Sequence, residues 1–158
     1  MTVDLRRPDA KGSNQVVVIK AGIVHKDSVL VLTSAIAGHG SRRDLPGGKL
    51  TYGEDPLSAL RREVQEETGM VIFPVAPVRL WSFLEHGSTQ YIGITIACRA
   101  ETKDVRLSTE HVKYEWLSRE EIPASWPERD ELLAVFECVE RGAPPIASTS
   151  EPQWPDDR

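Results

Sequence analysis

The most informative stretch of this chain is Gly48 to Met70, which reads GKLTYGEDPLSALRREVQEETGM. Asp55 is a residue type that caps helix N-termini, and Pro56 is tolerated as the first residue of a helix because that position needs no N–H donor. Gly69 is typical of the left-handed position that follows a last helical turn. These signals predict a helix over residues 55–68.

The acids of this helix lie beside its apolar face. At about 100° per residue, three apolar residues form the predicted buried stripe: Leu57, Leu60 and Val64. Glu63, Glu66 and Glu67 fall on the neighbouring arc, outside the stripe, at spacings that bring their charges close together. A divalent cation would relieve the repulsion, since Mg²⁺ prefers carboxylate oxygens. The alternative is a solvated acidic face, with Arg62 relieving part of the repulsion and pairing with Glu54.

The spacing around these acids is more specific than the acids alone. Gly48 is followed after five residues by Glu54, and after seven more by the run REVQEETGM, which matches every fixed position of G-x5-E-x7-R-E-U-x-E-E-x-G-U, where U is a bulky aliphatic residue. On these residues the chain resembles the Nudix (MutT-like) hydrolases. The order of strands around the stretch extends a broader resemblance to residues 15–141. The family implies an α/β fold, an α/β/α sandwich around a mixed β-sheet, and hydrolysis of a diphosphate linked to another group, usually in a nucleotide.

The resemblance also implies roles for individual residues. Its metal ligands for Mg²⁺ or Mn²⁺ would be Glu63, Glu66, Glu67 and the Gly48 carbonyl, and its bracing pair would be Glu54 and Arg62. Glu66 is the first choice for deprotonating the attacking water, followed by Glu63. A carboxylate outside the box often contributes in this family, and Glu110, six residues before Trp116, is the candidate here. The alternative is that Glu110 is an ordinary exposed loop acid.

The rest of the chain alternates between strand and helix signals. Strands are expected over 15–24, 28–33, 75–84, 89–100 and 114–117, with a loop over 35–44. A second helix is expected over 125–141, with Ser125 and Glu128 as a capping box and Gly142 after its end. This organisation predicts a Nudix domain over 15–141 between a polar tail, 1–14, and a Pro-rich tail, 142–158. In the second tail Trp154 could dock on the domain or on a partner.

Substrate contacts are predicted from two groups of residues. His39, Arg42 and Arg43 precede the box and could hold phosphates, or could belong to a solvated basic loop. Gly47 would let the backbone approach the metal and the substrate closely. Three aromatic residues on adjacent strands could stack on a base, although strand aromatics are more often core: Trp81, Phe83 and Tyr91. Trp116 is expected in the core, and His86 and His111 on the surface.

The choice of substrate depends mostly on subfamily motifs that the sequence lacks. No proline lies between Pro77 and Pro123, so the proline of many ADP-ribose hydrolases is missing. Tyr91 comes too late to match the tyrosine of diadenosine polyphosphate hydrolases, and no NADH or coenzyme A motif is present. This favours a (deoxy)nucleoside triphosphate, or an oxidised one, cleaved to monophosphate and pyrophosphate. A nucleoside diphosphate sugar, a nucleotide-sensing domain without turnover, and an isomerase that uses a catalytic cysteine are the alternatives. The isomerase is least favoured, since Cys98 lies mid-strand and Cys138 mid-helix.

Composition limits the class of partner. The 158 residues contain 24 acids and 19 Lys and Arg, a formal net charge of -5. This balance argues against binding to nucleic acid polymers or to anionic membranes, which attract basic surfaces. The polar start is not a signal peptide, and no apolar run approaches the ~20 residues that cross a bilayer. A cytoplasmic protein with two reduced thiols is expected, and both a monomer and a homodimer remain open.

Overall fold

The computed structural model describes residues 14–36 and 40–146, which form seven strands and two helices. His39, Trp154 and most of both expected tails lie outside these residues. The strands are β1 (Asn14–His25), β2 (Ser28–Ile36), β3 (Gly40–Asp44), β4 (Gly47–Lys49), β5 (Phe73–Glu85), β6 (Thr89–Arg99) and β7 (Lys113–Ser118). The helices are α1 (Pro56–Thr68) and α2 (Arg129–Glu140).

The strands form one mixed sheet in the order β3-β2-β1-β6-β5, with β4 on β1 and β7 on β2. β1 and β6 are parallel, and every other pair is antiparallel. One edge of β1 is shared by two strands: its end pairs with β2, as Val24 opposite Val29, and its middle pairs with β4, as Ile19 opposite Gly48. The link between β3 and β4 therefore carries the chain from a strand paired with β2 to a strand paired with β1.

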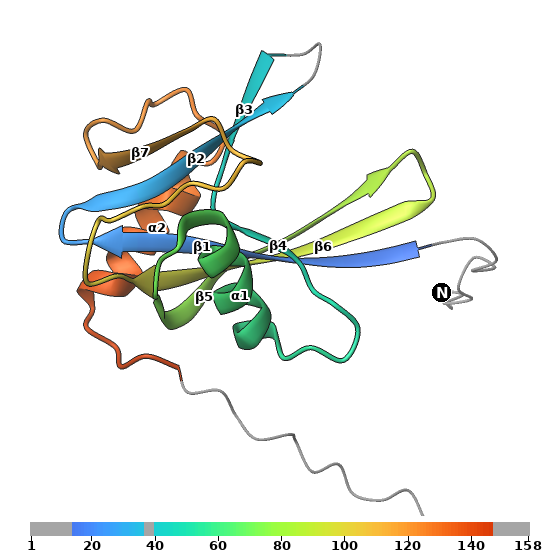
Figure 1. Cartoon of the computed structure of the whole chain (residues 1–158), viewed down its shortest axis with the longest axis horizontal. Helices are drawn as coiled ribbons and strands as arrows, with labels where there is room; N and C mark the ends of the chain where they lie inside the picture. The colour runs from blue at the N-terminus through green and yellow to red at the C-terminus, as the bar shows by residue number, and fades with distance from the viewer. Residues whose placement is uncertain (1–13, 37–39, 147–158) are drawn as a thin grey trace, which may run out of the picture.

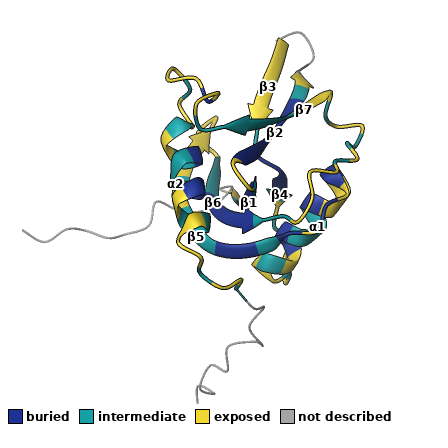
Figure 2. Cartoon of the chain, turned by 90° about the vertical axis from the view of Figure 1, so that its left-hand side faces the viewer, coloured by how far each residue is buried: buried dark blue, intermediate teal, exposed yellow. Residues whose placement is uncertain are grey.

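A helix covers each face of the sheet, as Figures 1 and 2 show, with α1 on one side and α2 on the other. Alternate residues of each strand turn to opposite faces. Ile19 of β1 packs with Leu60 and Val64 of α1, whereas Val24 packs with Val135 and Phe136 of α2. Cys98 is buried in the α1-side core, and neither it nor Cys138 forms a disulfide. The α/β/α sandwich is confirmed.

The first helix has the predicted ends. The Asp55 side chain accepts a hydrogen bond from the Ser58 N–H at 2.8 Å, and Gly69 adopts a left-handed conformation with φ 68°. Leu60 and Val64 are buried as predicted, but so is Glu67. The expectation that all three acids lie outside the buried face is wrong for Glu67, because its carboxylate reaches beneath the loop that enters β4 and binds backbone there.

Two other expectations are wrong. Residues 35–36 and 40–44 are strand rather than loop: β2 continues to Ile36, and β3 pairs with it in the register Thr33 opposite Arg43. β3 is largely exposed, so its side chains need not alternate between apolar and polar. The sequence of β3 therefore shows no strand pattern. The second helix begins at Arg129 rather than at residue 125, and Glu128 makes no side-chain capping bond. Pro127 explains the late start, because proline disfavours helical conformation in the residue before it.

The residues after α2 return to the sheet. The Arg99 guanidinium donates a hydrogen bond to the Ala143 carbonyl, and the Ile146 N–H donates to the Pro74 carbonyl at 2.7 Å. Residues 143–146 are thus tied to β5 and β6, although the sequence placed them at the start of a tail. No helix within residues 14–36 and 40–146 is both long and apolar enough to span a membrane.

Candidate active site

A short loop before β4 is held tightly against β1. Gly47 adopts φ +134°, and a Cβ atom at this position would lie 2.1 Å from the Ile19 carbonyl oxygen, so only glycine fits. The Lys20 ammonium donates to the Asp44 carboxylate at 2.9 Å and to the carbonyls of Leu45 and Gly47 at 3.2 and 3.3 Å. Lys20 thereby joins the end of β3 to the loop and fixes the Gly47 backbone.

The Gly47 backbone in turn holds Glu67 of α1. The Gly47 N–H donates to the Glu67 carboxylate at 2.8 Å, and His111 Nε2 lies 3.8 Å from its other oxygen. Burial raises the pKa of Glu67 to about 7, against the opposing effects of the Gly47 hydrogen bond and the Lys20 charge. A buried carboxylate with one hydrogen-bond donor retains unused acceptor capacity.

Arg62 organises the other acids of the helix. Its guanidinium makes a two-pronged pair with Glu54, at 2.8 and 3.0 Å, and donates to Glu63 at 2.9 Å and to Glu66 at 3.3 Å. The hydrogen bonds from Arg62 lower the pKa of Glu54 to about 2, and the bond to Glu54 raises the pKa of Arg62. The pair that the sequence suggested between Glu54 and Arg62 is therefore present, and it fixes the loop before the helix to the helix itself.

The acids have the chemistry of a metal site but are not gathered into one. In the described part of the chain, no three His, Cys, Asp or Glu side chains converge closely enough to hold an ion. Arg62 contacts Glu54, Glu63 and Glu66 and offsets part of their negative charge. A Cβ atom at Gly48 would lie 2.5 Å from the Glu63 carboxyl carbon, so glycine keeps this carboxylate and the Gly48 backbone close together. Oxygen ligands of this kind suit Mg²⁺ or Mn²⁺.

The loop between β6 and β7 adds two neighbours to Glu67. Glu110 is exposed, and its charge lies close enough to raise the Glu67 pKa further. His111 was expected on the surface, and this is wrong: its side chain is 7% exposed, and its Nδ1 is buried without a hydrogen-bond partner among the described residues. Burial lowers the pKa of His111. His86 is exposed in the β5–β6 turn, as expected.

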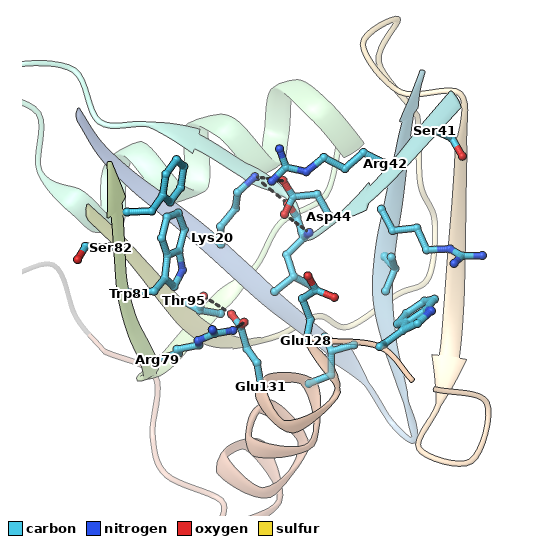
Figure 3. A pocket seen from close by; sticks show the side chains of 16 residues that line it. Lys20, Ser41, Arg42, Asp44, Arg79, Trp81, Ser82, Thr95, Glu128 and Glu131 are labelled. Carbon is cyan, nitrogen blue, oxygen red and sulfur yellow. Dashed lines mark hydrogen bonds and ion pairs between the residues drawn. The ribbon is translucent and has the colours of Figure 1, made fainter. Parts of the chain in front are cut away.

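A cavity of about 580 Å³ opens on the α2 face of the sheet (Figure 3). Four of the predicted substrate residues line it: Arg42, Arg43, Trp81 and Phe83. Lys20 and Asp44 also line it, so the Lys20 ammonium lies between the cavity and the loop that holds Glu67. The volume is in the range of small-molecule sites, about 300–1,000 Å³.

The aromatic residues form a wall rather than core. Trp81 lies across Gly93, where a Cβ atom would be 1.9 Å from its ring. Trp81 stacks on Phe83 with ring centroids 5.9 Å apart, and Phe83 stacks on Tyr91 at 4.9 Å. Phe83 is 51% exposed, so the alternative of a core position does not hold for it, whereas Trp81 and Tyr91 are half-buried. Tyr91 extends the stack without lining the cavity, whereas Trp116 packs against the α1-side core, as predicted.

The two predicted arginines differ in their contacts. The Arg43 guanidinium lies over the Trp126 ring, 4.6 Å from its centroid, and 4.0 Å from the Glu115 carboxylate. Arg42 lies 3.7 Å from the Asp44 carboxylate, and its side chain is 70% exposed. Of the two arginines that line the cavity, Arg42 therefore has the more exposed side chain and the fewer contacts.

Several cavity residues were not found from the sequence. The cavity floor holds Glu131, whose carboxylate accepts hydrogen bonds from Arg79 and Thr95, and Glu128 lies beside it. These contacts join residues far apart in the chain, so no local pattern could reveal them. Lys20 did leave a signal, since it is the only charged residue between Gln15 and Val24, in an otherwise apolar strand.

The chain is similar to known proteins over most of its described length. The family model described as NUDIX domain matches residues 15–141. An 8-oxo-dGTP diphosphatase from Haemophilus influenzae is 30% identical over an alignment of 91 residues, which covers 50% of this chain and 67% of that protein. The structure of a Nudix hydrolase from Nitrosomonas europaea has 25% identity and a TM-score of 0.63, covering 84% of this chain and 94% of that one. A MutT protein from Methanosarcina mazei has 28% identity and a TM-score of 0.62, covering 79% and 95%.

Proposed function

Because the chain belongs to the Nudix family of hydrolases, which act on pyrophosphate bonds, we propose that it cleaves a (deoxy)nucleoside triphosphate to monophosphate and pyrophosphate. One observation carries the proposal. A continuous set of contacts runs from Glu67 through Gly47 to Lys20, and Lys20 lines a cavity of nucleoside size. A base in the cavity would therefore direct its phosphates toward the box acids.

The cavity favours a guanine base. Trp81 and Phe83 offer ring faces for stacking, which accepts any base. The Glu128 carboxylate lines the same space and has no hydrogen bond or ion pair within residues 14–36 and 40–146. An ionised carboxylate only accepts hydrogen bonds, and guanine presents two adjacent donors, its ring N–H and its amino group. The 8-oxo-dGTP diphosphatase named above supports an oxidised guanine nucleotide as one such substrate.

Two cationic side chains would bind the phosphates. Lys20 and Arg42 both lie beside Asp44, at the side of the cavity nearest the loop of Gly47. Phosphate oxygens would replace part of the Asp44 interaction with these side chains, since charge-assisted hydrogen bonds to phosphate are strong. Arg43, which is held over Trp126, would shape the cavity wall.

Glu63, Glu66, Glu67 and the Gly48 carbonyl would hold Mg²⁺ or Mn²⁺. When bound, the cation supplies charge neutralisation at the phosphate oxygens and a water of lowered pKa. Arg62 braces Glu54 and keeps α1 fixed to the loop before it. Glu66 is the proposed base, because its side chain is 60% exposed and is therefore open to a water molecule. Glu63 and Glu110 are the alternatives for this proton transfer.

The test is a substrate panel with product identification. Canonical and 8-oxo nucleoside triphosphates, nucleoside diphosphate sugars and dinucleoside polyphosphates would be incubated with the protein in Mg²⁺, in Mn²⁺ and in EDTA. We expect monophosphate and pyrophosphate from guanine triphosphates, with the cation required. In ¹⁸O-labelled water, label in the monophosphate would locate the attack at the α-phosphorus. Preferred cleavage of a diphosphate sugar, or tight nucleotide binding without turnover, would overturn the proposal.

A further inference from the structure

The last strand of the sheet has an unprotected outer edge. β5 pairs only with β6, so its other edge is not covered by a strand of the described chain. Among residues 14–36 and 40–146, backbone hydrogen bonds made outside the sheet reach β5 only at Pro74, from Ile146, and at Glu85, within the hairpin turn. Edge strands offer unpaired N–H and C=O groups to other strands, and proteins usually blunt them with prolines, bulges or charges.

The prolines and bulges of β5 are confined to its first half. Pro74, Pro77 and both register irregularities lie before Arg79, whereas residues 79–85 pair regularly with β6. This second half protrudes beyond the two helices as part of the β5–β6 hairpin (Figure 1). Leu80 and Leu84 are 74% and 68% exposed there, on a segment of strand that could accept a partner.

The exposed half is complementary to itself. It reads Arg79-Leu80-Trp81-Ser82-Phe83-Leu84-Glu85, which is symmetric in residue class about Ser82. When two antiparallel copies are centred on Ser82, Leu80 faces Leu84, and Trp81 faces Phe83. The same register also brings Arg79 and Glu85 to opposite positions, but within one subunit Arg79 already pairs with Glu131, and Glu85 accepts a hydrogen bond from Tyr91. The pairing therefore depends on the leucines and the aromatic rings, since apolar and aromatic cross-strand pairs each stabilise a sheet.

We propose that two copies of this chain pair through residues 79–85 of β5, antiparallel, about a two-fold axis at Ser82. The symmetry favours a second copy over an unrelated strand, because an unrelated strand gives no reason for two exposed leucines, Leu80 and Leu84, at equal distances from Ser82. Side chains alternate, and Ser82 points to the opposite side of the strand from Trp81 (Figure 3). Trp81 and the partner's Phe83 therefore meet on the cavity face, and each subunit extends the aromatic wall of the other.

The first test uses charge at the leucines, which lie away from the cavity face. In the variant Leu80→Lys/Leu84→Lys, each lysine would face a lysine of the partner, and we expect the dissociation constant of the dimer to rise about tenfold or more. In the matched variant Leu80→Glu/Leu84→Lys, the register places opposite charges face to face, and the dimer should persist. Within one strand the two sites lie about 13 Å apart, so the monomers should have similar stabilities.

Sedimentation equilibrium of the full-length protein at micromolar concentrations measures both variants and the wild type. A dimeric wild type, a monomeric Lys/Lys variant and a dimeric Glu/Lys variant support the proposal. A monomeric wild type, or a Lys/Lys variant as dimeric as the wild type, overturns it. Pairing with residues 147–158 of the same chain instead would give a monomeric wild type.

The second test fixes the register. Residues directly opposite in an antiparallel pair have Cα atoms about 4.5–5.5 Å apart, within the range that disulfides span. Ser82→Cys should therefore cross-link to its own copy under mild oxidation. Leu84→Cys would lie about 13 Å from its copy and should cross-link much more slowly. Cys98 is fully buried, and the wild type provides the background from Cys138. Equal cross-linking of the two variants overturns the axis at Ser82.

Discussion

On the α1 face of the sheet, the charged side chains of the box come from one stretch, Glu54 to Glu67, and the backbone of the glycines just before it binds Glu67. On the α2 face, the cavity draws on β1, β2, β3, β5, β6 and α2, which are spread from Lys20 to Leu132. The first region is built from charges that compensate one another at short range. The second is built from ring faces and separated polar groups around open space.

This difference separates chemistry from recognition. Helical spacing holds Glu63, Glu66 and Glu67 together whatever the rest of the fold does, so substitutions there should change the chemical step. The cavity exists only when six elements of the fold are assembled, so substitutions there should change which molecule is bound and how tightly. Lys20 contacts both regions, since it lines the cavity and donates to the Gly47 carbonyl.

The largest effect is expected from Glu66→Gln. The change removes the proposed base and a proposed metal ligand, so kcat should fall about 10²–10⁴-fold, while nucleotide binding in the cavity should change little. Steady-state kinetics and calorimetric binding would measure the two quantities. Glu137→Gln is the matched control, because Glu137 is also 60% exposed and faces an arginine four residues away. A Glu66→Gln variant with the wild-type rate would remove this glutamate from the chemistry.

A smaller loss is expected from Gly47→Ala. The new Cβ atom would collide with the Ile19 carbonyl, so the loop would move and withdraw its N–H from Glu67 and its carbonyl from Lys20. Relieving this clash, which would cost about 1–3 kcal/mol, misplaces both backbone groups. We therefore expect kcat/KM to fall about 10- to 100-fold. Gly53→Ala is the control: it has a left-handed φ of +79° but nothing within 4 Å. Equal losses in both variants would mean that backbone strain alone matters.

The same difference explains how far the sequence could predict this molecule. The ends of α1 depend on neighbouring residues, so Asp55, Pro56 and Gly69 were sufficient to place the first helix. The burial of Glu67 and His111 could not be predicted, because their cover comes from loops distant in the chain. β3 was missed because it is stabilised by pairing with β2 rather than by its own side chains. The Glu131 network joins three elements and has no local signature.

Trp81→Ala tests the recognition side of the comparison. Stacking of a base on an aromatic ring contributes about 1–3 kcal/mol, so the KM for the preferred nucleotide should rise about 5- to 150-fold with kcat nearly unchanged. Trp81→Phe keeps a ring above Gly93 and should recover much of the affinity. Initial-rate kinetics on the same nucleotide would decide the matter. A fall in kcat as large as that of Glu66→Gln would show that the two faces do not act separately.

The smallest effect concerns the pH dependence of stability in EDTA. The pKa of Glu67 is about 7 in the folded, metal-free protein and near 4.5 when it is exposed, so the folded state keeps this proton over a range where the unfolded state loses it. The resulting stabilisation is complete below about pH 4.5 and is lost as pH rises toward 7. Its size is on the order of 3 kcal/mol, or about 6–12 °C in Tm.

Glu67→Gln isolates this contribution, because glutamine resembles the protonated acid at every pH. In EDTA, the Tm of the wild type should fall relative to that of the variant between pH 5 and pH 7.5, as measured by scanning calorimetry. Mg²⁺ should then raise the wild-type Tm more at pH 7.5 than at pH 5, since below pH 7 the cation would have to displace the proton. Parallel Tm curves for the two proteins would mean that Glu67 is ionised throughout, with Lys20 and Gly47 compensating its burial in full.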